Sequence, residues 1–264
     1  MDKVFFQAVE VEGQVLSLEC QWLNAARSNR PLMVFLHEGL GSLSQWRDFP
    51  LRLCESIDCR GLLFSRPGYG RSTPRTEPWP RDYLERQTQG LLPAVFRSLD
   101  LSDEPLLLFG HSDGASLALL YAAQAPQQVR AVAALAPHLF VEPVTLVGLQ
   151  AARQAYEQGR SLRQALARHH ADTDSAFYGW NDAWLAPGAE HWNIESLLRD
   201  RLHCPVLALQ GVGDEYGSLR QIEAIAALHA DTTVLALQDC GHSPHRDQPE
   251  QVIAAVQALL ERLP

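Results

Sequence analysis

The most restrictive stretch of this sequence runs from Pro105 to Tyr121 and reads PLLLFGHSDGASLALLY. It opens with an apolar run, residues 106–109, of the length of a buried parallel strand, and from Ala115 on its apolar residues have helical spacing. Between the two lies Gly110-His111-Ser112-Asp113-Gly114, a serine flanked by glycines. Such glycines suit a sharp strand-to-helix turn in which the serine backbone is strained and its hydroxyl stands exposed. The stretch predicts Ser112 as a nucleophile; the alternative is a soft turn in which Ser112 only caps the helix.

The same order of apolar strand, glycine-containing loop and helix recurs along most of the chain. Strands are predicted at residues 31–36, 61–64, 129–135, 204–210 and 232–237, and helices at 44–55, 81–99, 219–229 and 249–263. This alternation indicates a mostly parallel sheet with helices on both faces. Two alternating segments, residues 4–10 and 15–22, predict an antiparallel hairpin at one edge. Ligands of such sheets bind beyond the carboxyl ends of the strands, where Ser112 would lie.

No strand is predicted between residues 138 and 199. The apolar residues of this segment have helical spacing at 149–156 and 161–170, and the part that follows is rich in aromatic residues, with Trp180 and Trp184 at its centre. We expect it to form a helical lid inserted into a core made of residues 1–137 and 200–264. Trp180 and Trp184 are expected to line a substrate pocket, with ordinary packing inside the lid as the alternative. His169-His170 is expected on a solvated helix face.

Composition narrows the class of function. A chain of 264 residues with 46% hydrophobic content has room for one large core with an insertion, and a net charge of −9 argues against nucleic acid or an anionic membrane as the main partner. No stretch has the apolar length of a membrane span, and the first residues lack a basic region followed by an apolar block. Five cysteines without C-x-x-C spacing suggest neither a disulfide framework nor a zinc site. We therefore expect a cytoplasmic protein that acts on a small molecule without cofactor or metal; the oligomeric state is left open.

An acyl-transferring serine needs a base and a carboxylate that orients the base. Asp214 and His242 lie in loops that directly follow two successive predicted strands, so a parallel sheet would bring both to the edge where Ser112 lies. Glu215 is a rival for the acid and His245 for the base. His111, next to the nucleophile, is expected to point elsewhere. The order Ser112, Asp214, His242 is the order of triad residues in an α/β-hydrolase.

On these residues the chain resembles the α/β-hydrolases, in particular the lid-bearing esterase and carbon–carbon hydrolase group, over almost its whole length. In that family the loop H-G-x supplies a backbone N–H to the oxyanion, which the resemblance assigns to Gly39 in His37-Glu38-Gly39. Asp113, directly after the nucleophile, would supply the second N–H. Glu38 stands where the family usually has glycine.

A second family signature, D-x-R-G-x-G-x-S, is matched by Ser65-Arg66-Pro67-Gly68-Tyr69-Gly70-Arg71-Ser72, with serine in place of the usual aspartate. The motif is structural in the family. A serine nucleophile weighs against the branches of haloalkane dehalogenases and epoxide hydrolases, which use aspartate there. Ser112-Asp113-Gly114 is also similar to the biphenyl hydrolase-like (valacyclovir hydrolase) branch, in which this aspartate binds the amino group of amino-acid esters. For this chain the resemblance implies that Asp113 binds the substrate, whose acyl group would be cationic.

The Asp113 carboxylate needs a partner. Unpaired and about 6 Å from a forming oxyanion, it would oppose the oxyanion by roughly 3 kcal/mol at an effective dielectric constant of about 20. The candidates are a substrate ammonium group, a nearby arginine such as Arg66, or the helix N-terminus. The expected activity is hydrolysis of a carboxylic ester or related acyl bond. The alternatives are carbon–carbon hydrolysis of ring-cleavage-type diketones and a non-catalytic binding module.

Overall fold

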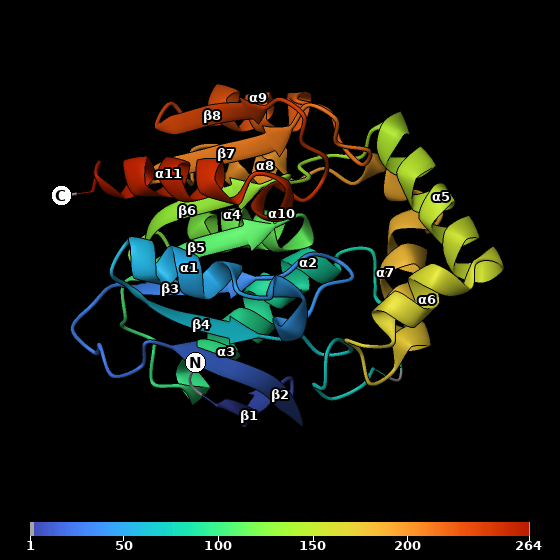
Figure 1. Ribbon diagram of the computed structural model, residues 1–264, viewed down its shortest axis with the longest axis horizontal. Coiled ribbons are helices and arrows are strands. Elements are labelled where there is room, and N and C mark those ends of the chain that lie inside the picture. The colour runs from blue at the N-terminus through green and yellow to red at the C-terminus, as the bar shows by residue number, and fades with distance from the viewer. Residues whose placement is uncertain (1–2, 76, 264) are drawn as a thin grey trace.

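The computed structural model describes residues 3–75 and 77–263, and its centre is one eight-stranded sheet (Figure 1). The strands are β1 (Val4–Val11), β2 (Gln14–Leu23), β3 (Leu32–Leu36), β4 (Arg60–Phe64), β5 (Leu106–His111), β6 (Val129–Leu135), β7 (Val206–Gly211) and β8 (Thr232–Leu237). Their order in the sheet is β1-β2-β4-β3-β5-β6-β7-β8. β1 pairs antiparallel with β2 and β2 with β4, and every other neighbouring pair is parallel. The predicted edge hairpin and the mostly parallel sheet are thus confirmed.

Helices cover both faces of this sheet because its central strands are apolar on both sides. In β3, Leu32, Val34 and Leu36 belong to one buried cluster, and Met33 and Phe35 to the other. The second cluster includes residues of α1 (Phe49–Ser56) and α11 (Pro249–Leu260), which lie in front of the sheet in Figure 1. The first includes residues of α3 (Leu92–Ser98), α4 (Asp113–Gln124) and α9 (Arg220–Leu228). This is the architecture that alternating strands and helices predict.

Between β6 and β7 the chain forms helices in place of strands. These are α5 (Pro143–Gln158), α6 (Arg160–Leu166), α7 (Thr173–Leu185), the short 3₁₀ turn η3 (Ala189–His191) and α8 (Glu195–Leu198). Figure 1 shows α5, α6 and α7 beyond the carboxyl ends of the strands, at one side of the molecule. They therefore stand over the edge of the sheet on which Ser112 lies.

Two of the predicted helices are interrupted. Residues 44–55 form a 3₁₀ turn, η1 (Leu43–Trp46), and then α1, because Arg47 has a positive φ of 55° and Pro50 belongs to a new first turn. Residues 81–99 form α2 (Tyr83–Arg86), a π-helical segment η2 (Gln87–Leu91) and α3, with Pro93 in the first turn of α3. The last short helix is α10 (Pro244–Asp247).

The prediction of a solvated His169-His170 face is wrong for His170. Helix α6 ends at Leu166, and His170 is 5% exposed. Its Nδ1 accepts from the Gly70 amide at 3.0 Å, and its Nε2 lies 2.9 Å from the Leu40 carbonyl. The ring therefore joins the end of α6 to two loops of the core.

The structure shows what replaces the aspartate that the second signature lacks. Glu19, buried in β2, accepts from the Ser65 hydroxyl at 2.9 Å and from the Arg71 amide at 3.1 Å. The Ser65 hydroxyl oxygen in turn accepts from the Leu43 amide at 2.9 Å. A carboxylate from the neighbouring strand thus serves the glycine loop.

Candidate active site

Ser112 lies in a strained turn between β5 and α4. Its φ is 53° and its ψ is −120°, outside the regions that residues with side chains commonly occupy. Gly114 is required because a Cβ there would lie 1.9 Å from the Leu36 carbonyl oxygen, and a Cβ at Gly110 would lie 2.2 Å from the Gly114 carbonyl oxygen. The Ser112 side chain makes no capping hydrogen bond to α4. The helix-cap alternative for Ser112 is therefore wrong.

The structure brings together the three side chains that the chain order singles out. His242 Nε2 lies 2.9 Å from Ser112 Oγ, and His242 Nδ1 lies 2.9 Å from each carboxylate oxygen of Asp214. The three residues follow β5, β7 and β8 at the same edge of the sheet. Because the carboxylate fixes the proton on Nδ1, Nε2 is left to accept the serine proton.

Charge and hydrogen bonding set the pKa values of the pair. Burial alone would raise the pKa of Asp214, but the hydrogen bond and charge of His242 hold it below its usual value. Burial alone would lower the pKa of His242, but the Asp214 carboxylate raises it above 6.5. The Tyr216 amide donates to Asp214 at 2.8 Å and the Gln210 side chain at 3.1 Å, so the carboxylate is held from three sides.

The rival residues occupy other positions. His245 packs with Trp46 and Phe49, and its ring nitrogens have no hydrogen-bond partner among the described residues. His111 Nε2 lies 2.6 Å from the backbone carbonyl of His242 and therefore supports the loop of that residue. Glu215 is exposed at the pocket.

The resemblance assigns the backbone amides of Gly39 and Asp113 to the oxyanion, and this assignment stays a prediction. Within residues 3–75 and 77–263, neither the Gly39 amide nor the Asp113 amide donates to a protein acceptor. Both residues line the same cavity as Ser112. A Cβ on Gly39 would lie 2.1 Å from the Trp180 ring, so Trp180 of α7 packs directly on this loop.

The carboxylate of Asp113 has protein partners on both of its oxygens. Tyr83 donates its hydroxyl to Oδ2, the Trp184 indole N–H lies 3.2 Å from Oδ1, and Arg66 Nη2 lies 3.7 Å from Oδ2. Burial and the charge of Asp113 raise the pKa of Tyr83 well above its usual value, so its hydroxyl stays a donor. Of the three candidate partners, two are therefore in place: Arg66, and the N-terminus of α4, of which Asp113 is the first residue.

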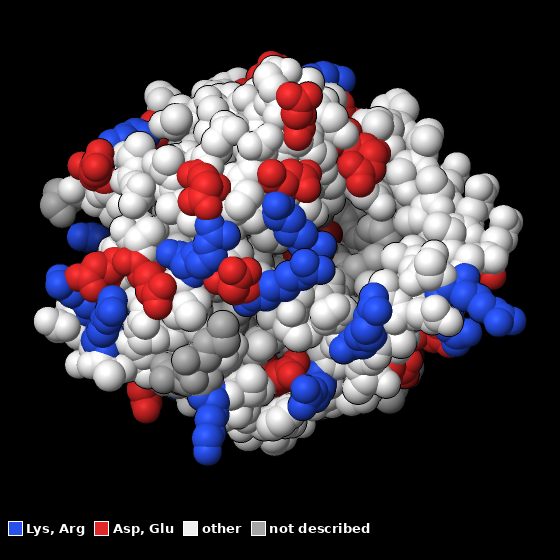
Figure 2. Space-filling view, viewed as in Figure 1, with Lys and Arg blue, Asp and Glu red and all other residues white. Residues whose placement is uncertain are grey.

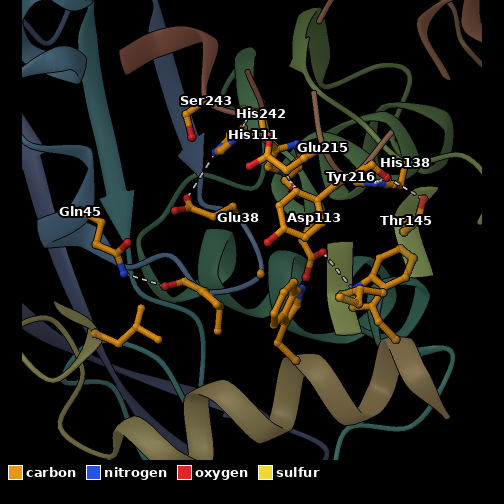
Figure 3. Close-up of a pocket in the computed structure, with 17 residues that line it drawn as sticks. Glu38, Gln45, His111, Asp113, His138, Thr145, Glu215, Tyr216, His242 and Ser243 are labelled. Carbon is orange, nitrogen blue, oxygen red and sulfur yellow. Dashed lines mark hydrogen bonds and ion pairs between the residues drawn. The ribbon is translucent and has the colours of Figure 1, made fainter. Parts of the chain in front are cut away.

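The cavity beside Ser112 has a volume of about 220 Å³ and lies between the sheet edge and the helices α5 and α7 (Figure 3). Figure 2 shows a hollow in the surface between the core and the lobe formed by these helices, with side chains of both charges on the core beside it. The apolar part of the wall comes from Leu40, Leu149, Leu166, Trp180 and Trp184. Trp180 and Trp184 are only 8% and 6% exposed, so both line the cavity and also belong to the packed interior.

Sequence reasoning left part of the surroundings of the site without a role or a position. It gave no site role to Glu38, His138 or Tyr216, which line the cavity, and it did not place Arg66 beside the 37–39 loop. His138 follows β6 directly, and its ring lies 5.9 Å from that of His242, so its strand-end position was an available signal. Glu38 Oε2 lies 3.4 Å from His111 Nδ1, and Glu38 Oε1 lies 3.6 Å from Arg246 Nη2. Burial alone would raise the pKa of Glu38, but these contacts, mainly that with His111, hold it well below its usual value.

Within the described residues, no helix has the length and apolar character of a membrane span. A parallel sheet with a strained serine after a central strand, and an aspartate and a histidine after two later ones, defines the α/β-hydrolase class. The chain belongs to the alpha/beta hydrolase family, whose model matches residues 33–255. It is accordingly a hydrolase, as the sequence predicts.

Curated relatives are distant. The biotin biosynthesis bifunctional protein BioHC of Cellvibrio japonicus is 28% identical over 89% of this chain and 48% of that protein, so this chain spans about half of that relative's length. The sn-1-specific diacylglycerol lipase ABHD11 of Mus musculus is 25% identical over 87% of this chain and 81% of that protein.

Solved structures share the fold. A thermophilic esterase from Thermogutta terrifontis superposes with a TM-score of 0.72 at 17% identity and 98% coverage of both chains. The enol-lactonase from Burkholderia xenovorans LB400 superposes with a TM-score of 0.74 at 17% identity, over 96% of this chain and 98% of that chain.

Proposed function

We propose that this chain is a serine hydrolase that cleaves a carboxylic ester or related acyl bond of a small molecule through an acyl-enzyme. The observation that carries the proposal is the continuous set of 2.9 Å contacts from Ser112 through His242 to Asp214. The esterase, the lipase and the lactonase among the similar proteins support an ester-type bond. The proposal includes residues 138–199 as the lid. It also includes a cytoplasmic location, which five free, buried cysteines support.

The reaction begins when Ser112 Oγ attacks the acyl carbon and its proton passes to His242 Nε2. The carbonyl electron pair moves to the oxygen, which accepts hydrogen bonds from the Gly39 and Asp113 amides. His242 then gives the proton to the leaving oxygen as the ester bond breaks. A water molecule, deprotonated by His242, repeats the sequence on the acyl-enzyme and frees Ser112. Asp113 enters this mechanism through its backbone amide.

Replacing the nucleophile tests the proposal. Ser112→Ala is expected to lower kcat by something on the order of a millionfold on the best ester, with the fold unchanged, because the attacking atom is lost. Turnover of p-nitrophenyl esters and circular dichroism measure the two effects. Turnover near that of the unchanged enzyme would refute the assignment of Ser112.

A carbon–carbon hydrolase would use the same triad. Vinylogous diketones and simple p-nitrophenyl esters, compared at equal enzyme concentration, separate the two activities. Ester cleavage that exceeds diketone cleavage is the expected result, and the reverse order would favour the alternative.

A further inference from the structure

One peptide group at the site carries an unusual set of hydrogen bonds. The carbonyl oxygen of Glu38 lies 2.7 Å from His37 Nδ1, and it accepts from Arg66 Nη2 at 2.8 Å and from the Gly41 amide at 3.0 Å. His37 Nε2 accepts from the Arg66 backbone amide at 3.0 Å, so the ring proton lies on Nδ1 and points at the Glu38 carbonyl. Burial and the charge of Arg66 keep the pKa of His37 well below its usual value, so the ring is neutral.

The other end of the same peptide group is the N–H of Gly39, the proposed oxyanion donor. Hydrogen bonds to the carbonyl end of a peptide polarise the group, and chains of such bonds strengthen one another by about 10–30% per bond. Three donors on the Glu38 oxygen therefore make the Gly39 N–H a better donor and fix its direction. The Arg66 guanidinium also adds positive charge behind this peptide.

Arg66 also contacts the side chain of Asp113, the residue whose amide is the second proposed oxyanion donor. Arg66 is fully buried, and its Nη2 lies 3.7 Å from the Asp113 carboxylate. A buried guanidinium is costly unless it is paired, and here it offsets the carboxylate that would repel an oxyanion. One side chain thus contacts both the Glu38 carbonyl, whose peptide carries the Gly39 amide, and the Asp113 carboxylate.

We propose that Arg66, together with His37, is a positioning residue of the oxyanion hole, which polarises and orients the peptide between Glu38 and Gly39. This proposal rests on the proposed serine hydrolase function. It gives the two family signatures, His37-Glu38-Gly39 and the Arg66 glycine loop, one shared role in catalysis: the second holds the peptide that the first contributes.

The test uses a trifluoromethyl ketone labelled with ¹³C at its carbonyl. Ser112 Oγ adds to that carbon, the electron pair moves to the oxygen, and the serine proton passes to His242. The ¹³C shift as a function of pH then reports the pKa of the bound oxyanion. The comparison is between Asp113→Asn and Arg66→Met/Asp113→Asn, because the asparagine removes the charge that Arg66 otherwise balances.

In the double variant we expect the oxyanion pKa to rise and kcat to fall by about tenfold or more, with KM nearly unchanged, since loss of an entire donor costs about 10²–10³ in kcat. Gln87→Met is the matched control, because Gln87 accepts from the other side of the guanidinium, at Nη1, 3.2 Å away. It should leave the oxyanion pKa unchanged.

A second pair of variants changes His37, the other side chain that contacts the Glu38 carbonyl. These variants test the proposal if the Arg66 variant does not fold. His37→Leu removes the donor and should raise the oxyanion pKa, while the amide of His37→Asn should restore it in part. Equal oxyanion pKa values in all folded variants, or an equal shift in the Gln87 control, would overturn the role of Arg66 and His37. Failure of the unchanged enzyme to form any adduct would instead contradict the proposed function.

Discussion

His242 acts as a base only when its ring is neutral, so its pKa controls the proposed reaction. The Asp214 carboxylate raises that pKa above 6.5 against the effect of burial. A raised pKa makes the ring a stronger base, but it also means that the ring is protonated in a larger fraction of the molecules at neutral pH. The same carboxylate thus sets both the orientation of the ring and the pH at which it is active.

The first prediction concerns the pH profile. The kcat/KM of the unchanged enzyme is expected to fall as pH drops through the pKa of His242, with a midpoint above pH 6.5. Asp214→Asn should move the midpoint to lower pH and reduce kcat by about 10⁴-fold, because the ring loses the group that raises its pKa and fixes its tautomer. An unchanged midpoint in this variant would show that Asp214 does not set the pKa.

Residue positions were predictable where they depend on strand ends. Ser112, Asp214 and His242 each follow an apolar strand directly, so a parallel sheet alone brings them to one edge. The contact of Arg66 with the Glu38 carbonyl joins residues 28 positions apart in two different loops. Strand ends predict neither loop path nor side-chain direction, and so this contact required the structure.

At the scale of elements, the link between β2 and the glycine loop shows how a missing motif residue is replaced. The carboxylate of Glu19 accepts from the side chain of Ser65 and the backbone of Arg71. A position on an adjacent strand thus supplies the group that the family carries within the loop itself.

This link predicts a rescue. Glu19→Ala should lower the free energy of unfolding by about 1–3 kcal/mol, because buried donors lose their acceptor. Adding Ser65→Asp should recover part of that loss, as the aspartate returns a carboxylate to the loop. Denaturant unfolding measures both, with Glu10→Ala on the exposed side of β1 as the control. A double variant no more stable than Glu19→Ala would contradict the replacement.

Whether a segment forms a helix or a strand was easier to predict from the sequence than where that helix or strand begins and ends. The helix predicted at residues 44–55 has a break at Arg47, where φ is positive, and α6 ends before His170. Apolar spacing continues across both points, because periodicity records which residues face the core and not where the backbone turns.

At the scale of the whole molecule, the sheet positions Ser112, Asp214 and His242, and the helices α5, α6 and α7 bound the cavity beside them. The cavity of about 220 Å³ is lined in part by Trp180, which packs on Gly39. Aromatic residues between 177 and 192 indicated a wall. Which of them contacts the core depends on how α7 docks, which spacing does not determine.

The cavity predicts a preference for short acyl chains. Across a series of p-nitrophenyl esters, kcat/KM should fall as the chain lengthens, and Trp180→Ala should move the optimum to longer chains by opening the wall. Trp192→Ala is the control, because Trp192 packs on the far side of Trp184 and does not line the cavity. The same chain-length profile in all three proteins would exclude Trp180 from the substrate wall.

The central claim is that His242 and Asp214 make the hydroxyl of Ser112 nucleophilic. Labelling with a fluorophosphonate, followed by mass spectrometry of the modified peptide, tests it most directly. The account predicts one adduct, located on Ser112, and its loss in His242→Ala although that variant remains folded. No adduct on the unchanged protein, or equally fast labelling of Ser112 without His242, would contradict it.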